Sequence, residues 1–220
     1  MLFHLSSENL VGVRAKLQPV GAQQSSRAER PARADARRNL DALLQSAVEV
    51  FATSGVDAPV RDIAERAGVG IGTLYRHFPQ RSDLIAAVFR REVDACADAA
   101  VSLAADHGPG EALSRWLQRY ASFIATKRGL APALHSGDPA FSSLRAYFEQ
   151  RLRPALRALL DAAAGTGEVR SDVDADDLLS AVGSLCMPAN DDKPGYAQRM
   201  VALLVDGLRH RGKPAVRTTS

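Results

Sequence analysis

Basic and hydroxyl-bearing side chains gather in one stretch of the sequence that lacks acidic residues. The stretch from Arg66 to Ser82 contains no aspartate or glutamate, although the whole chain holds 28 basic and 25 acidic residues. A guanidinium can donate two hydrogen bonds to guanine O6 and N7, which makes Arg76 and, just before the stretch, Arg61 candidates for reading bases. Tyrosine, threonine and histidine can donate to phosphate oxygens and so position a protein on DNA. The stretch therefore carries the side chains that DNA binding requires.

Two short helices are expected to position these side chains. The first fits Pro59 to Ala67, because proline suits the first turn of a helix. The second fits Ile71 to Phe78 and is ended by Pro79. Gly68 lies at the turn between them, where a positive φ is easiest for glycine. This pattern predicts a helix-turn-helix whose second helix enters the major groove of DNA.

A set of motifs surrounds these two helices. In chain order they are Ala47-x-x-x-Phe51, Gly55, Ile63-Ala64-x-x-Ala67-Gly68-Val69, Thr73-Leu74-Tyr75-x-His77-Phe78 and Leu84. With them, residues 38–88 resemble the DNA-binding domain of the TetR (tetracycline-repressor) family of bacterial transcriptional regulators. By motif the resemblance covers about a quarter of the chain. Residues 167–179 also look like the segments that lead into the dimerisation helices of many members.

The resemblance implies a role for each candidate DNA-binding residue. Positions that commonly touch the phosphate backbone or nearby bases are matched by Thr73, Tyr75 and His77. The variable face that reads base edges is matched by Gly70, Ile71, Gly72 and Arg76. Arg61 matches a guanine contact of some members, and Arg81 matches a basic phosphate contact.

Other interpretations remain open for two of these residues, and one feature departs from the family pattern. Tyr75 could be a packing residue with an exposed hydroxyl, and a lone histidine such as His77 is usually structural. Many members place Ser or Thr before the second helix, where this chain has Asp57-Ala58-Pro59. We expect Asp57 to cap that helix instead. A carboxylate disfavours a phosphate contact at this point.

Residues 1–37 are expected to form a flexible extension. The first part shows no sustained period, and residues 27–38 hold five arginines against Glu29 and Asp35. This basic arm could enter a groove of DNA or be a solvated tail. Helical periodicity begins near Asn39 and continues to Phe51.

The rest of the chain has the pattern of a helical bundle. Apolar residues recur at helical spacing in five further segments, from Ser82 to about Ala105, from Glu111 to Lys127, from Ser142 to Ala164, from 174 to 187 and from 195 to 210. Residues 129–139 are expected to be a loop with one turn of helix. Pro154 should kink or restart its helix, and Asp174 should cap the next one. The chain is thus predicted to be all-α, with about nine helices.

A ligand cavity between helices of the bundle is implied by the resemblance and is typical of helical bundles. The large or polar-tipped side chains that could line it are Trp116, Tyr120, Phe123, His135, Phe141, Tyr147, Phe148 and Met187. Each of them alone is more simply explained as an ordinary core residue.

Several other classes of protein are disfavoured. The longest stretch without a charged residue, Leu178 to Asn190, is shorter than the about 20 residues that span a membrane. No secretory signal is seen. Cys96 and Cys186 fit no metal-ligand spacing and indicate a reduced, cytoplasmic protein. They are most simply buried apolar residues, and the alternative is a thiol sensor. No catalytic motif, metal site or cofactor site is found, so an enzyme is not expected.

The sequence therefore predicts a homodimeric transcriptional regulator, most simply a repressor that an unknown small molecule releases from its operator. A helix-turn-helix domain is expected over residues 38–82, a ligand-binding and dimerisation domain over 83–212 and a tail over 213–220. The helices at about 174–187 and 195–210 would pair two copies, and the symmetry predicts a palindromic operator in double-stranded DNA. Three alternatives are an activator of the same fold, a helical-bundle enzyme or small-molecule carrier with a non-functional helix-turn-helix, and an adaptor that binds another protein.

Overall fold

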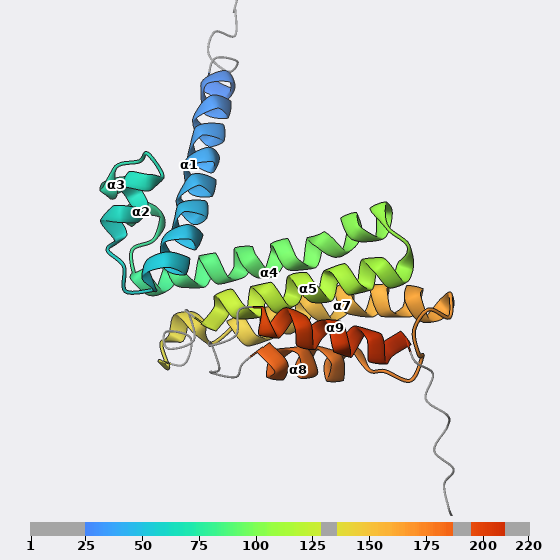
Figure 1. Ribbon diagram of the computed structural model, residues 1–220. Helices are drawn as coiled ribbons and strands as arrows, with labels where there is room; N and C mark the ends of the chain where they lie inside the picture. The colour runs from blue at the N-terminus through green and yellow to red at the C-terminus, as the bar shows by residue number, and fades with distance from the viewer. Residues whose placement is uncertain (1–24, 129–135, 187–194, 210–220) are drawn as a thin grey trace, which may run out of the picture. The chain divides into compact units, whose positions relative to one another are not determined.

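The computed structural model describes residues 25–128, 136–186 and 195–209. Within these ranges the chain forms eight α-helices, one short 3-10 helix and no strand (Figure 1). They are α1 (Ser25–Ser54), α2 (Val60–Arg66), α3 (Ile71–His77), α4 (Arg81–Asp106), α5 (Pro109–Arg128), η1 (Pro139–Phe141), α7 (Leu144–Gly165), α8 (Ala175–Cys186) and α9 (Tyr196–Arg209). The predicted all-α fold is confirmed.

The α1 helix begins at Ser25, well before the expected start near Asn39. The expected start of this helix is thus wrong, since residues 25–37 are helical, whereas residues 1–24 lie outside the described ranges and the flexibility of the extension stays a prediction. Alanine and arginine dominate this part of α1, and both are strong helix formers that need no apolar face. Our prediction relied on apolar periodicity, which starts only after Asn39. The described chain divides into two units at this point, the first ending at Arg38 and the second beginning at Asn39.

The turn between α2 and α3 depends on Gly68. This glycine has a φ of 67°, and its N–H bonds to the carbonyl of Glu65 while the N–H of Val69 bonds to the carbonyl of Ala64, both at 3.0 Å. The two bonds form a Schellman motif, which ends α2 and turns the chain into α3. Ile63 and Ala64 are buried beneath this turn, as the helix-turn-helix pattern predicted.

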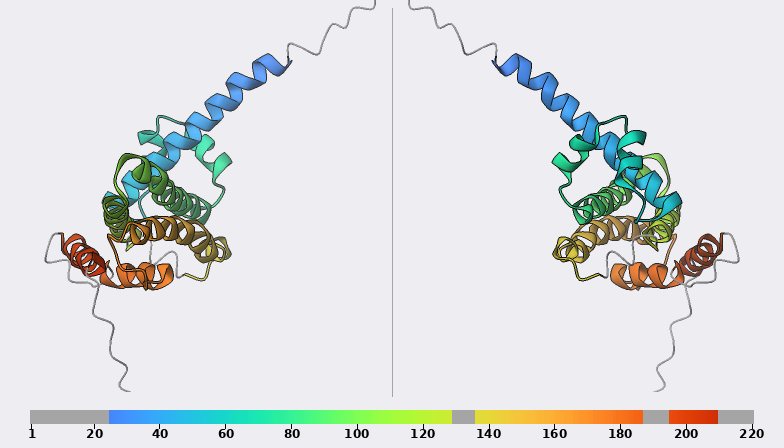
Figure 2. Two further views of the ribbon diagram at one scale, coloured as in Figure 1. Left: turned by 90° about the vertical axis from the view of Figure 1, so that its right-hand side faces the viewer. Right: turned by 90° about the vertical axis from the view of Figure 1, so that its left-hand side faces the viewer.

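The α4 helix connects the helix-turn-helix to the bundle. It starts at Arg81, one residue before the predicted Ser82, and its first turn is closed by Asp83, whose carboxylate accepts from the N–H of Gln80 at 3.0 Å. Farther along, α4 packs against α5 and α7. The helices α8 and α9 pack on α5, on the side of the bundle away from α4 (Figures 1 and 2).

The start of α8 and the end of α7 follow from the sequence, and α7 also contains an interior proline. The Asp174 carboxylate accepts from the N–H groups of Asp176 and Asp177, which confirms it as the cap of α8. Gly167, at a φ of 75°, ends α7. Pro154 does not restart α7, which runs through it as one helix with the proline ring exposed.

A pair of glycine substitutions tests the role of the turn. We expect Gly68→Ala to lower the free energy of unfolding by about 1 kcal/mol, because an alanine is strained at positive φ. No atom lies within 4 Å of where its Cβ would stand, so the loss is purely conformational. Gly72→Ala, inside α3 with equally open surroundings, should instead raise the free energy of unfolding by about 0.5–1 kcal/mol, because glycine destabilises the interior of a helix relative to alanine. Urea denaturation followed by circular dichroism measures both. A shift of the same sign in the two variants would contradict this account.

Candidate nucleic-acid interface

The α3 helix has one buried side and one exposed side. Leu74 is 1% exposed and anchors the helix on the core, whereas Ile71 and Tyr75 are 42% and 50% exposed. Gly72 and Arg76 are also exposed, and Thr73 and His77 are half-buried. The exposed side thus carries the residues predicted to read base edges. Tyr75 is half exposed, which suits a contact with DNA, and its role stays a prediction.

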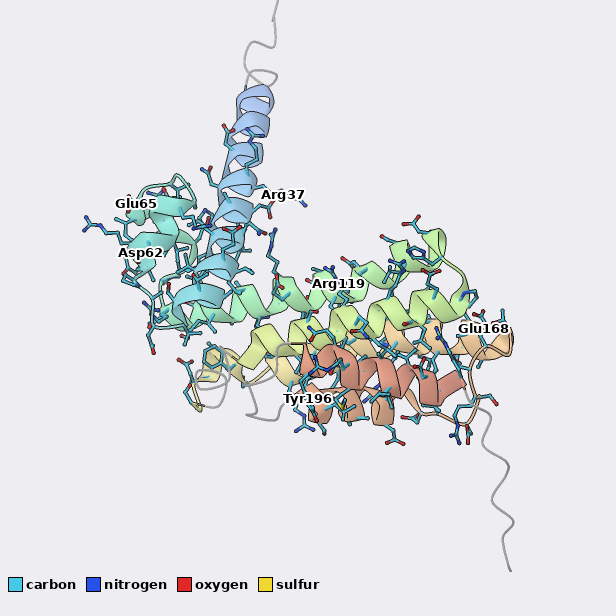
Figure 3. All side chains as sticks on the ribbon, in the orientation of Figure 1. Arg37, Asp62, Glu65, Arg119, Glu168 and Tyr196 are labelled. Atoms are coloured by element: carbon cyan, nitrogen blue, oxygen red, sulfur yellow. The ribbon has the colours of Figure 1, made fainter. Side chains whose placement is uncertain are left out.

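The exposed surface of α2 is of mixed charge. Arg61 is exposed, as a base-reading residue must be, but Asp62 and Glu65 are exposed on the same short helix (Figure 3). Carboxylates repel phosphates, so α2 can approach DNA closely only where Arg61 lies. Asp57 was expected to cap α2, and this expectation is wrong. The N-cap residue is Pro59, and no side chain caps the helix.

Arg66 is neutralised by a residue that sequence reasoning did not connect to it. Its Nε lies 2.6 Å from the Glu49 carboxylate of α1. Hydrogen bonds from Gln45 and then from Arg66 hold the pKa of Glu49 below its usual value, so that the acid stays ionised. The acid-free stretch therefore offers DNA fewer unpaired cations than its composition suggests. No local pattern signals a pair between residues 17 positions apart.

Arg81 has partners within the protein. Its guanidinium donates to the backbone carbonyl of Val56 and, at 2.8 Å, to that of Ala58. Both carbonyls belong to the loop between α1 and α2. Arg81 therefore clamps the entrance of α2 to the start of α4. The contact of Arg81 with a phosphate stays a prediction. Because two of its five N–H donors are already used, at most three are left for a phosphate.

The aromatic candidates for a ligand cavity pack against one another. Rings of Trp116, Tyr120, Phe123 and Phe148 lie between 5.6 and 6.2 Å apart, centroid to centroid, in successive pairs. Trp116 Nε1 donates to the carbonyl of Cys96 at 2.9 Å, and the Tyr120 hydroxyl donates to that of Leu179 at 3.4 Å. These side chains fill the core and satisfy their own polar atoms.

The remaining candidates are placed differently. The Tyr147 hydroxyl donates to both oxygens of Asp94 at 2.7 Å, at the surface between α4 and α7. Phe141 belongs to the short helix η1 and is half-buried. His135 and Met187 lie outside the described residues. The thiol of Cys96 is buried, and burial raises its pKa to about 12, so it is a protonated, unreactive core residue at neutral pH.

Two hollows open beside α4, and none of the predicted aromatic residues lines either of them. One, of about 620 Å³, lies between α4 and α7. The other, of about 500 Å³, lies between α4 and α5. Alanines are the commonest residues lining the first hollow, and the second is lined by three small residues, three charged residues and Leu103. Our prediction selected large side chains, which occupy space, whereas a hollow forms where facing side chains are small.

Both the helix-turn-helix region and the bundle of the chain match models of known protein families. Residues 43–88 match the model of the bacterial regulatory proteins of the tetR family, and residues 108–210 match the model of the SbtR-like transcriptional regulator C-terminal domain. A TetR transcriptional regulator from Streptomyces coelicolor superposes with a TM-score of 0.68 at 39% identity, over 78% of this chain and 99% of its own. The chain belongs to the TetR family.

Two further relatives agree with this assignment. A TetR regulator from Mycobacterium vanbaalenii gives a TM-score of 0.64 at 36% identity, over 82% of this chain and 100% of its own. An HTH-type transcriptional regulator of Staphylococcus aureus is 40% identical over 63 residues, which are 28% of this chain. That match spans only 34% of the length of the curated relative. This TetR-family chain is therefore a transcriptional regulator with a helix-turn-helix, and none of its described helices could cross a membrane.

A measurement of protein stability distinguishes the structural role of Arg81 from a role in contacting DNA. Arg81→Met removes both hydrogen bonds and leaves two carbonyls without this donor, so we expect the free energy of unfolding to fall by about 1–3 kcal/mol. Arg76→Met, also an arginine of this region but exposed on α3, should change it by less than about 0.5 kcal/mol. Urea denaturation of the two proteins makes the comparison. Equal stability of both variants would mean that the clamp contributes nothing.

Proposed function

We propose that the chain is a homodimeric regulator that binds a palindromic operator through α3. A small molecule would release the regulator from this operator. The exposed side of α3 carries this proposal, because Arg76 and Tyr75 stand on a helix anchored from below by Leu74. Arg76 and Arg61 would read guanines, and Thr73, Tyr75 and His77 would contact phosphates. The DNA-binding domain would cover residues 38–82, and the effector-binding and dimerisation domain residues 83–212.

The helices α8 and α9 are the proposed dimer interface. In α9, Ala197, Val201, Val205 and Leu208 are buried in the bundle, whereas Leu203 is 63% exposed. An exposed leucine on a helix whose opposite side is already buried suits an isologous contact with a second copy. Two copies related in this way would present their α3 helices to half-sites one helical turn, or a multiple of it, apart.

The α4 helix would carry the signal from the bundle to α3. Besides the Arg81 clamp, Arg91 Nη1 lies 3.2 Å from the Asp41 carboxylate of α1. Two contacts thus tie the first part of α4 to the DNA-binding helices. A ligand that shifts α4 within the bundle would move these helices with it, and the distance between the two α3 helices of a dimer would change.

A gel-shift experiment on the region upstream of the protein's own gene tests the proposal. Specific retardation that excess random DNA does not remove is the expected result. Retardation that vanishes with random competitor would count against a sequence-specific regulator. In vitro transcription from the retarded fragment then tells a repressor, which lowers transcript level, from an activator.

The role of Arg76 is tested by comparing two DNA substrates. Because a bidentate contact with guanine is made only at the correct base, Arg76→Ala should weaken operator binding by about 1–3 kcal/mol and relax the preference at one base pair. Binding to random DNA should change much less. Fluorescence anisotropy with a panel of single-base operator variants measures both effects. An equal loss on operator and random DNA would make Arg76 a phosphate contact.

The proposed dimer interface is tested by Leu203→Glu. Burying an unpaired carboxylate costs roughly 3 kcal/mol or more, so the dimer dissociation constant should rise by about 100-fold or more. Val101→Glu is the matched control, since Val101 is 76% exposed on α4, away from α8 and α9. Sedimentation equilibrium reports the oligomeric state. If Leu203→Glu stays as dimeric as the Val101→Glu protein, the interface lies elsewhere.

A further inference from the structure

The exposed side of α3 carries an apolar strip made by Ile71 and Tyr75. In the described part of the chain four large apolar side chains are exposed, and these two of them lie on a helix of only seven residues. They are four residues apart and therefore stand one above the other on the same side of the helix. Gly72 and Arg76, which are also exposed and four residues apart, form the neighbouring row.

Gly72 leaves open space beside this strip. Its φ is not positive, and no atom beyond its chain neighbours and the helix backbone lies within 4 Å of where a Cβ would stand. Neither the backbone nor the surroundings therefore require a glycine, and an alanine would favour the helix. What the glycine provides is bare backbone that a ligand can approach closely, next to an apolar side chain.

Only one group on the base edges of the major groove is apolar. Purines and cytosine present hydrogen-bond donors and acceptors there, which the Ile71 side chain cannot pair, whereas thymine adds its C5-methyl group. Apolar side chains are the usual contacts of this methyl group. Tyrosine combines an apolar ring with a polar tip, so the Tyr75 ring can border the methyl group while its hydroxyl contacts a phosphate.

The charges around the strip favour DNA as its partner. No acidic residue occurs from Arg66 to Ser82, and the guanidinium of Arg76 is exposed on the row beside the strip. Every base pair is flanked by phosphates, which attract an exposed guanidinium and repel carboxylates. An apolar strip in such surroundings suits a base edge in DNA.

We propose that the strip of Ile71 and Tyr75 reads the C5-methyl group of one thymine in each operator half-site, and that the space left by Gly72 holds this methyl group. The inference rests on the proposed function in taking α3 as the helix that enters the major groove. It adds a base that α3 recognises without hydrogen bonds, beside the guanines that Arg76 and Arg61 would read.

Deoxyuridine substitution tests the contact, because deoxyuridine pairs with adenine as thymine does and lacks only the methyl group. In the fragment retarded in the gel shift, symmetry-related thymines are replaced one pair at a time, and fluorescence anisotropy measures the dissociation constant. We expect one pair to weaken binding about fourfold per half-site, and so about 16-fold in total, since a buried methyl contributes about as much as a methylene. Ile71→Ala should lose most of this preference for thymine.

Gly72→Ala tests the space for the methyl group. Its own methyl would take the place of the thymine methyl, so binding of the unmodified fragment should fall by about tenfold or more through overpacking. Deoxyuridine at the sensitive pair should recover most of this loss, whereas deoxyuridine at the other pairs is the control and should recover nothing. Unfolding does not explain such a loss, because this variant is expected to be more stable than the parent.

The outcomes separate this inference from the proposed function. Specific binding by the parent that tolerates deoxyuridine at every thymine would overturn the inference and leave the proposed function standing. A deoxyuridine effect that Ile71→Ala retains in full, or a loss in Gly72→Ala that no deoxyuridine pair relieves, would overturn it as well. Retardation that random DNA abolishes would instead overturn the proposed function, and the thymine contact with it.

Discussion

The arrangement of the DNA-binding helices depends on α4 belonging to two packing units at once. Its first residue, Arg81, bonds to the loop that leads into α2, and Arg91 pairs with Asp41 of α1. The same helix continues into the bundle, where its buried face, including Val93 and Cys96, packs on α5 and α7. A helix is stiff over this length, so α4 cannot satisfy one set of contacts without fixing the position of the other.

Local features of this fold could be predicted because they depend on a few neighbouring residues. Gly68 had to adopt a positive φ to end α2, and Asp174 had to satisfy the first N–H groups of α8. Contacts between distant segments could not be predicted in the same way. The pairing of Arg66 with Glu49 and the bonds of Arg81 to the α1–α2 loop require the tertiary structure, and they changed which arginines are available to DNA.

The exposed side of α3 could be predicted from the sequence, whereas the position of the hollows could not. The exposed side of α3 follows from helical geometry once Leu74 is recognised as its buried anchor. A hollow, in contrast, is a property of two facing helices. Trp116, Tyr120 and Phe123, which were expected to line a cavity, fill the core. The larger hollow instead lies where Ala100 and Ala104 of α4 and Ala155 and Ala158 of α7 line it. In a single helix these alanines indicate only high helix propensity.

The polar end and the hollow end of the α4–α7 contact are suited to different tasks. Tyr147, whose single hydroxyl proton is shared between the two carboxylate oxygens, and Arg151 hold Asp94 with charge-assisted hydrogen bonds, which are about twice as strong as neutral ones. This end of the contact therefore resists separation. The hollow end has little packing to lose, so a displacement of the helices costs least there.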